Sequence, residues 1–190
     1  MIAHSIESAL ESKLFENVYV STDDIEVADI SKSYGASVPF LRPKIYSDDF
    51  ATDREVRHHF IEWLGANNMN PGVMCYLYAT APFCSPDILI SCYNMLVKRR
   101  AGSVHTITTF PYPIMRALSK DKDGFLSFVW EENAQKRSQD FVEYFHDAGM
   151  CYFYDLSKYS NSMPSMGLQI PRYKCQDIDT LEDLENARNL

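Results

Sequence analysis

One segment near the middle of the chain carries most of the information about its architecture: VMCYLYATAPFCSP, residues 73–86. It opens with an unbroken apolar run, Val73 to Tyr78, which is typical of a strand buried on both faces of a sheet. A short turn follows. Ser85 and Pro86 then mark the start of a helix that runs to Arg100, because proline is tolerated at the first helical position. A strand, a turn and a helix in this order predict an α/β protein.

Strand-like and helix-like stretches alternate on both sides of this segment. Further helices are predicted at residues 25–34, 54–64 and 180–190, and further strands at 18–22, 103–110, 149–154 and 173–175. Alternation of this kind predicts a three-layer α/β fold with a mostly parallel sheet. The length of 190 residues predicts a single domain, residues 1–190.

Polar residues mark several boundaries between these elements. The pair Asp23-Asp24 precedes the helix at 25–34, and an aspartate at such a junction caps the first backbone N–H groups. Thr180 and Asp183 have the spacing of a capping box at the start of the last helix. The polar stretch from Ser157 to Pro171 is predicted to be a mobile loop or an oligomer contact.

Composition narrows the class of protein. The formal net charge is −8, and nucleic acid is bound through dense lysine and arginine contacts, so a general nucleic-acid binder is disfavoured. No run approaches the roughly 18 apolar residues that a membrane span needs. The first residues lack the features of a signal peptide, so we expect a cytoplasmic protein. The five cysteines form no CxxC pair, which predicts reduced thiols packed as small hydrophobic side chains.

The first candidate for chemistry is a pair of aspartates. In a parallel sheet, ligands bind beyond the carboxyl ends of the strands, and Asp177 and Asp179 follow the strand predicted at 173–175. Residues two apart on an extended chain point the same way, so both carboxylates can face one Mg²⁺ ion. The alternative is that either aspartate caps the following helix.

Two basic segments are candidates for binding anions. Arg42 can hold phosphate through its planar guanidinium. Arg137 can pair with a substrate carboxylate while Gln139 bonds to sugar hydroxyls, and His146 with Asp147 can contact sugar or phosphate oxygens. Taken alone, each of these segments is also typical of a solvated surface loop. The chain has no GxSxG elbow, no HExxH zinc motif and no GxxxxGK[ST] phosphate loop.

Taken together, ordered motifs along the whole chain resemble the acylneuraminate cytidylyltransferase family, most closely its pseudaminic acid branch. These motifs are a first helix at residues 1–10, VSTDD at 20–24, VPFLRP at 38–43, YATAPF at 78–83, FPYPIMRAL at 110–118, RSQD at 137–140, HDAG at 146–149 and DIDT at 177–180. The RSQD segment followed by HDAG resembles the pseudaminic branch better than the sialic acid branch.

The resemblance implies a Rossmann-like nucleotidyltransferase fold, usually a homodimer. It also implies transfer of CMP from CTP to a nine-carbon sugar acid, pseudaminic acid, with Mg²⁺ and release of pyrophosphate, for glycosylation of surface glycans or flagellin. By resemblance, the metal is assigned to Asp177 and Asp179, the nucleotide to Arg42, Thr80 and Ala81, and the sugar acid to Arg137, Gln139, His146 and Asp147. Asp177, Asp179 and Arg137 are the residues expected to be catalytic.

The sequence departs from the family pattern at three places. Family members open with a strand and a Gly/Arg/Lys-rich loop around the triphosphate, and this sequence starts just after that loop. We therefore expect the fold to lack its usual first strand and loop. Tyr78 stands where sialic acid enzymes carry glutamine, and Asp53 and Arg54 stand where small hydroxyl residues are expected. The alternatives are a sialic acid or manno-octulosonate cytidylyltransferase, or a non-catalytic, shortened paralogue.

Overall fold

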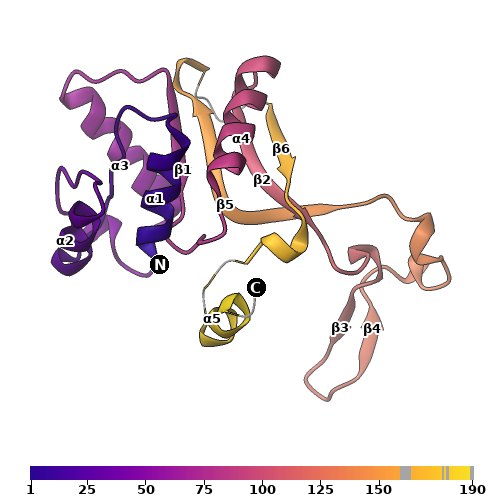
Figure 1. Ribbon diagram of the computed structural model, residues 1–190. Helices are drawn as coiled ribbons and strands as arrows, with labels where there is room; N and C mark the ends of the chain where they lie inside the picture. Colours follow the sequence, from indigo (N-terminus) through magenta and orange to yellow (C-terminus); the bar gives the residue numbers. More distant parts are fainter. Residues whose placement is uncertain (159–163, 177, 179, 189–190) are drawn as a thin grey trace.

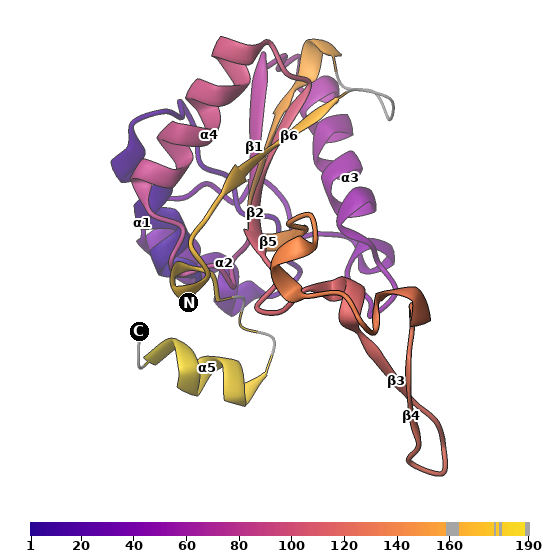
Figure 2. The same ribbon diagram turned by 90° about the vertical axis from the view of Figure 1, so that its right-hand side faces the viewer.

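The computed structural model describes residues 1–158, 164–176, 178 and 180–188. Within them, a four-stranded sheet has the order β1-β5-β2-β6. The strands are β1 (Val73–Leu77), β5 (Phe145–Asp155), β2 (Ser103–Thr109) and β6 (Ser165–Gln169). Helices α1 (Ile2–Ser12) and α4 (Pro86–Arg99) cover one face, and α3 (Asp53–Ala66) covers the other (Figure 2). The predicted three-layer α/β fold is confirmed.

The direction of the strands shows where the sequence was informative and where it was not. Strands β1, β2 and β6 run the same way, and β5 runs in the opposite direction between β1 and β2. The prediction of a mostly parallel sheet is confirmed for strand direction. The prediction did not include the two antiparallel pairings within the sheet, those of β5 with β1 and with β2. The reason is that an apolar run reports burial on both faces and carries no information about direction.

The remaining elements lie at the margins of the sheet. A long arm, residues 110–144, leaves β2 and returns as β5, and it carries a hairpin of β3 (Leu118–Lys120) and β4 (Leu126–Phe128) (Figure 1). Helix α2 (Ile25–Ser33) follows α1, and α5 (Leu181–Arg188) lies near the amino terminus. Short 3₁₀ helices occupy Lys44–Tyr46, Ile114–Arg116, Glu131–Asn133, Ser138–Asp140, Leu156–Lys158 and Arg172–Lys174. None of the helices in the described part of the chain is long and apolar enough to cross a membrane.

Three predictions of secondary structure need correction. The segment at 173–175 is not a strand: Tyr173 and Lys174 belong to the 3₁₀ helix Arg172–Lys174, which is preceded by Pro171 and followed by Cys175. The stretch predicted as a loop at 157–171 contains β6, which pairs with β2 in parallel. In β6, Gly167 lies against Ile107, and a Cβ at this position would come within 2.4 Å of the isoleucine side chain. The strand predicted at 18–22 is reduced to two isolated parallel bridges.

The main core lies between the sheet and helix α4, and Leu14 and Phe15, just after α1, pack against it. Its fully buried side chains include Leu89, Val104 and Phe153. Cys92 and Cys151 are also fully buried there, with their sulfurs 3.9 Å apart. Both pack as small hydrophobic side chains, as predicted from the sequence.

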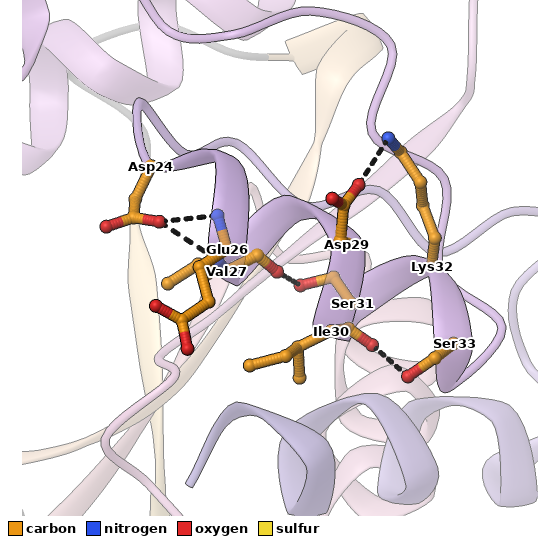
Figure 3. A network of polar contacts seen from close by, with 8 residues as sticks. All are labelled: Asp24, Glu26, Val27, Asp29, Ile30, Ser31, Lys32 and Ser33. Atoms are coloured by element: carbon orange, nitrogen blue, oxygen red, sulfur yellow. Dashed lines mark hydrogen bonds and ion pairs between the residues drawn. The ribbon is translucent and has the colours of Figure 1, made fainter.

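The start of α2 shows how the sequence sets a helix boundary. One carboxylate oxygen of Asp24 accepts hydrogen bonds from the backbone N–H groups of Glu26 and Val27, at 2.7 and 3.1 Å (Figure 3). This confirms the predicted aspartate cap and identifies Asp24 as the capping residue. Gly35, with φ of 93°, follows the helix and adopts a left-handed conformation that glycine tolerates at no steric cost.

Replacing this cap should have a measurable effect on stability. Asp24→Ala is expected to lower the free energy of unfolding by about 1 kcal/mol, because two backbone N–H groups lose their acceptor. The matched control is Asp29→Ala in the same helix. Asp29 makes an exposed ion pair with Lys32 at 3.2 Å, so its loss should cost less than about 0.5 kcal/mol. Urea unfolding measures both variants, and equal losses would contradict the assignment of the cap.

Candidate active site

The carboxyl end of β1 leads into a turn that is fixed from two sides. The N–H of Tyr78 donates to the carbonyl of Met150 on β5 at 3.0 Å. The carbonyl of Tyr78 accepts from the hydroxyl of Ser5 on α1 at 2.9 Å. Further along the turn, Thr80 is half-buried and the Ala81 side chain lies in the core. Because its side chain lies in the core, Ala81 would contact the nucleotide through its backbone, as a prediction. The turn that carries Ala81 lies at the edge of the sheet where α/β proteins bind ligands.

A shallow cavity of about 260 Å³ lies beside this turn. It is lined by Met1, His4, Pro82, Phe83, Ile178, Leu184, Ala187 and Arg188. Ile178 is the residue between the two aspartates of the DIDT motif, and it is only 7% exposed. The YATAPF turn, the first residues of α1 and Ile178, which are far apart in sequence, therefore meet at one cavity.

The metal ligands predicted from the sequence, Asp177 and Asp179, lie outside the described residues, so their role stays a prediction. No group of three or more histidine, cysteine, aspartate or glutamate side chains in the described ranges is arranged to hold a metal ion. The neighbouring structure bears on the alternative role of these aspartates. Thr180 and Asp183 form the predicted capping box, with bonds of 2.7 to 3.2 Å. Helix α5 thus has a cap that requires neither aspartate.

Arg42 ties two motifs together. Its guanidinium donates to the carbonyl of Ser21 at 3.3 Å and lies 3.6 Å from the carboxylate of Asp23, both in the VSTDD turn. Its Nε donates to the hydroxyl of Ser47 at 3.0 Å. A phosphate bound to Arg42 would have to share the guanidinium with Asp23. The role of Arg42 in binding the nucleotide stays a prediction.

Arg137 and Gln139 lie on the arm, where Ser138–Asp140 form a 3₁₀ helix. The guanidinium of Arg137 donates two hydrogen bonds of 2.9 Å to the carboxylate of Asp140. This two-point geometry is the one that a substrate carboxylate would use, so a sugar acid would have to displace Asp140 from the arginine. From the sequence, Arg42 was assigned to the nucleotide and Arg137 to the sugar acid of one active site. In the structure, the contacts of the two arginines involve different parts of the chain.

His146 and Asp147 lie at the exposed start of β5. The ring of His146 packs against Phe110 with centroids 4.8 Å apart. The carboxylate of Asp147 accepts from the N–H of Gly149 at 2.9 Å. Burial, together with a hydrogen bond to Asp147, raises the pKa of the Tyr152 phenol. Asp147 therefore faces Tyr152, a residue to which the sequence analysis gave no role.

Tyr152 belongs to a group of three rings, which we call the tyrosine cluster: Tyr76, Tyr78 and Tyr152. The ring centroids are 5.4 to 6.3 Å apart. The hydroxyls of Tyr76 and Tyr78 both donate to the carboxylate of Asp53, the first residue of α3. The available signal was the spacing of Tyr76 and Tyr78, two residues apart and so on one face of β1. Within an apolar run, that spacing predicts only that the two side chains are buried.

Comparison with known proteins decides the family. Residues 1–121 match the cytidylyltransferase family. Over its full length the chain is 36% identical to a protein named pseudaminic acid cytidylyltransferase from Campylobacter jejuni, of which it covers 84%. This chain belongs to the cytidylyltransferase family. The resemblance described from the sequence motifs is thereby confirmed.

Other relatives of this cytidylyltransferase carry related names. A CMP-N,N′-diacetyllegionaminic acid synthase from Legionella pneumophila is 36% identical over 57% of this chain and 43% of that protein. Among solved structures, a CMP:2-keto-3-deoxy-manno-octonic acid synthetase complexed with CTP aligns with a TM-score of 0.64. That alignment covers 99% of this chain and 86% of the other at 15% identity, so it supports the fold alone. The predicted Rossmann-like nucleotidyltransferase fold is confirmed.

Proposed function

We propose that this cytidylyltransferase transfers CMP from CTP to pseudaminic acid and releases pyrophosphate. The observation that carries the proposal is the 36% identity, over the whole chain, to a protein named for this activity. The cavity where the YATAPF turn meets Ile178 of the DIDT segment supports it, because both motifs carry residues predicted to bind CTP or its metal. The RSQD and HDAG segments favour pseudaminic acid over sialic acid.

The chemistry requires the sugar acid and the nucleotide to lie in line. The anomeric hydroxyl of the sugar acid forms a bond to the α-phosphorus, the bond from that phosphorus to the bridging oxygen breaks, pyrophosphate leaves, and the hydroxyl proton goes to solvent. Mg²⁺ fits the donor set of Asp177 and Asp179, and when bound it neutralises charge on the phosphate oxygens. Arg42 would hold phosphate at the VSTDD turn, and Arg137 would hold the sugar carboxylate once Asp140 releases it.

The activity is tested by incubating the chain with CTP, Mg²⁺ and one of three sugar acids: pseudaminic acid, sialic acid or manno-octulosonate. We expect pyrophosphate release with pseudaminic acid and much slower release with the other two. Release with sialic acid but not with pseudaminic acid would refute the assignment of the sugar. No release with any of them, together with no heat on titration with CTP, would favour a non-catalytic paralogue.

We infer a cytoplasmic location from the proposed substrate, because CTP is a cytoplasmic nucleotide. The product would then serve as the activated donor for glycosylation of surface glycans or flagellin. This role follows from the proposed activity and is tested with it.

The arm supports a homodimer. Its hairpin extends away from the sheet (Figure 2), and the exposed apolar side chains on the arm include Leu118, Phe125, Leu126, Val129 and Val142. A two-stranded hairpin standing alone in water is only marginally stable. A group of exposed apolar side chains marks an interaction surface. We propose that a second copy of this chain covers the hairpin.

Charged residues at the centre of this surface should separate the two copies. The double variant Leu118→Lys/Leu126→Lys is expected to convert a dimer into a monomer, because it places unpaired charges in an apolar interface. Light scattering after size-exclusion chromatography measures the mass directly. The control is Asp123→Lys, which introduces the same residue into the exposed turn of the hairpin and should leave a dimer. A monomeric wild type, or a variant that stays dimeric, would contradict the proposal.

A further inference from the structure

Asp53 joins helix α3 to the end of strand β1. Its two carboxylate oxygens accept hydrogen bonds from two different tyrosines: Oδ1 from Tyr76 at 3.0 Å, and Oδ2 from Tyr78. Asp53 is the first residue of α3, directly after Thr52, whose hydroxyl and backbone form a capping box with Glu55. The backbone that carries the carboxylate is therefore fixed by the cap, and the carboxylate in turn holds both phenols.

The two tyrosines that Asp53 holds, Tyr76 and Tyr78, are partly exposed, whereas Tyr152 behind them is buried. Tyr78 is the first residue of the YATAPF turn, at the carboxyl end of β1. Its ring packs 5.5 Å from that of Tyr152, whose pKa is raised by burial and by the neighbouring Asp147 carboxylate. The tyrosine cluster therefore extends from the nucleotide turn to the start of β5, where His146 and Asp147 are predicted to contact the sugar acid.

The YATAPF turn joins the two halves of the site, because Pro82 and Phe83 line the cavity and Tyr78 belongs to the tyrosine cluster. The cavity next to the DIDT segment is lined by residues of α1 and α5, whereas the tyrosine cluster packs with Phe60 and Ile61 of α3. Tyrosine offers an apolar ring face together with a hydroxyl that forms hydrogen bonds, and this combination suits a ligand with apolar faces and many polar groups, such as a sugar.

We propose that Asp53 is a positioning residue: it fixes the partly exposed phenols of Tyr76 and Tyr78 as the surface on which the sugar acid lies, and so sets affinity for the sugar acid rather than for CTP. This inference rests on the proposed function. Asp53 affects binding of the sugar acid because it fixes the orientation of the two phenols. Without the carboxylate, both phenols can rotate and must be ordered again when the substrate binds, which weakens binding.

The test is a comparison of Michaelis constants. Asp53→Asn keeps the size of the side chain and removes its charge, and it is expected to raise KM for the sugar acid about tenfold while KM for CTP changes less than about twofold. Tyr76→Phe removes one of the two bonds and should raise KM for the sugar acid by a smaller factor. Asp53→Glu retains the carboxylate and should recover part of the loss. The control is Glu62→Gln, which removes an exposed negative charge from the same helix.

The possible outcomes separate this inference from the proposed function. A wild type that turns over no sugar acid refutes the proposed function itself. An active wild type whose Asp53→Asn variant keeps its KM for the sugar acid refutes the role of Asp53. A variant in which both Michaelis constants rise together also refutes it, because Asp53 would then support the whole turn. Urea unfolding of each variant distinguishes lost binding from lost stability.

Discussion

Asp179→Asn is expected to lower kcat/KM for CMP transfer about a thousandfold or more. The phosphate groups of CTP carry several negative charges, and the ion that we propose Asp177 and Asp179 hold would neutralise them. A thousandfold loss corresponds to about 4 kcal/mol of transition-state stabilisation, which lies within the contribution expected of a catalytic metal ion. Initial rates of pyrophosphate release, measured over a range of Mg²⁺ concentrations, give the effect.

The control for this variant is Glu182→Gln. It removes one negative charge three residues further along, from the exposed face of α5, and it should leave kcat/KM within about twofold. Asp177→Asn should resemble Asp179→Asn, because both carboxylates are predicted to bind the same ion. An Asp179→Asn variant with full activity would refute the metal site.

Phe153→Ala should produce the largest loss of stability, about 3–5 kcal/mol in the free energy of unfolding. Phe153 is 0% exposed and lies in β5, where it pairs with Cys75 on one side and Val104 on the other. Its ring also packs against those of Phe15 and Tyr93, with centroids 6.0 and 6.4 Å apart. Truncation leaves a cavity that rigid strands on both sides cannot fill.

The matched control is Phe125→Ala, in the exposed turn of the hairpin. The side chain of Phe125 is 75% exposed, so the same truncation removes little buried area and should change stability by less than about 0.5 kcal/mol, measured in the monomeric double variant of the arm. Urea unfolding measures both. Similar losses for Phe153→Ala and Phe125→Ala would mean that the core is not centred on β5.

The helices and strand β1 could be predicted because the sequence signals that mark them are local. Pro86 at the start of α4, Asp24 before α2 and the box of Thr180 with Asp183 each act within one helical turn. The direction of β5 and the presence of β6 depend on distant partners. Strand β6 pairs with β2, and at Gly167 it lies so close to Ile107 that a side chain would clash, a contact that no local pattern encodes.

The contacts between side chains in the candidate site were harder to predict from the sequence. Arg42 and Arg137 were predicted to bind the nucleotide and the sugar acid, and their ion pairs with Asp23 and Asp140 could not be foreseen from spacing alone. Asp53 was noticed only as a departure from the family pattern. Its contact with Tyr76 and Tyr78 is created by packing α3 against the sheet, which a reading along the chain cannot supply.

The transfer of CMP itself is tested most directly by following the phosphorus of CTP. The chain is incubated with CTP, Mg²⁺ and pseudaminic acid, and ³¹P NMR spectra are recorded over time. We predict that the three triphosphate signals give way to one phosphodiester signal and to pyrophosphate, and that no change occurs when the sugar acid is omitted. Unchanged triphosphate signals with the sugar acid present, or conversion to CDP and inorganic phosphate, would contradict the proposed reaction.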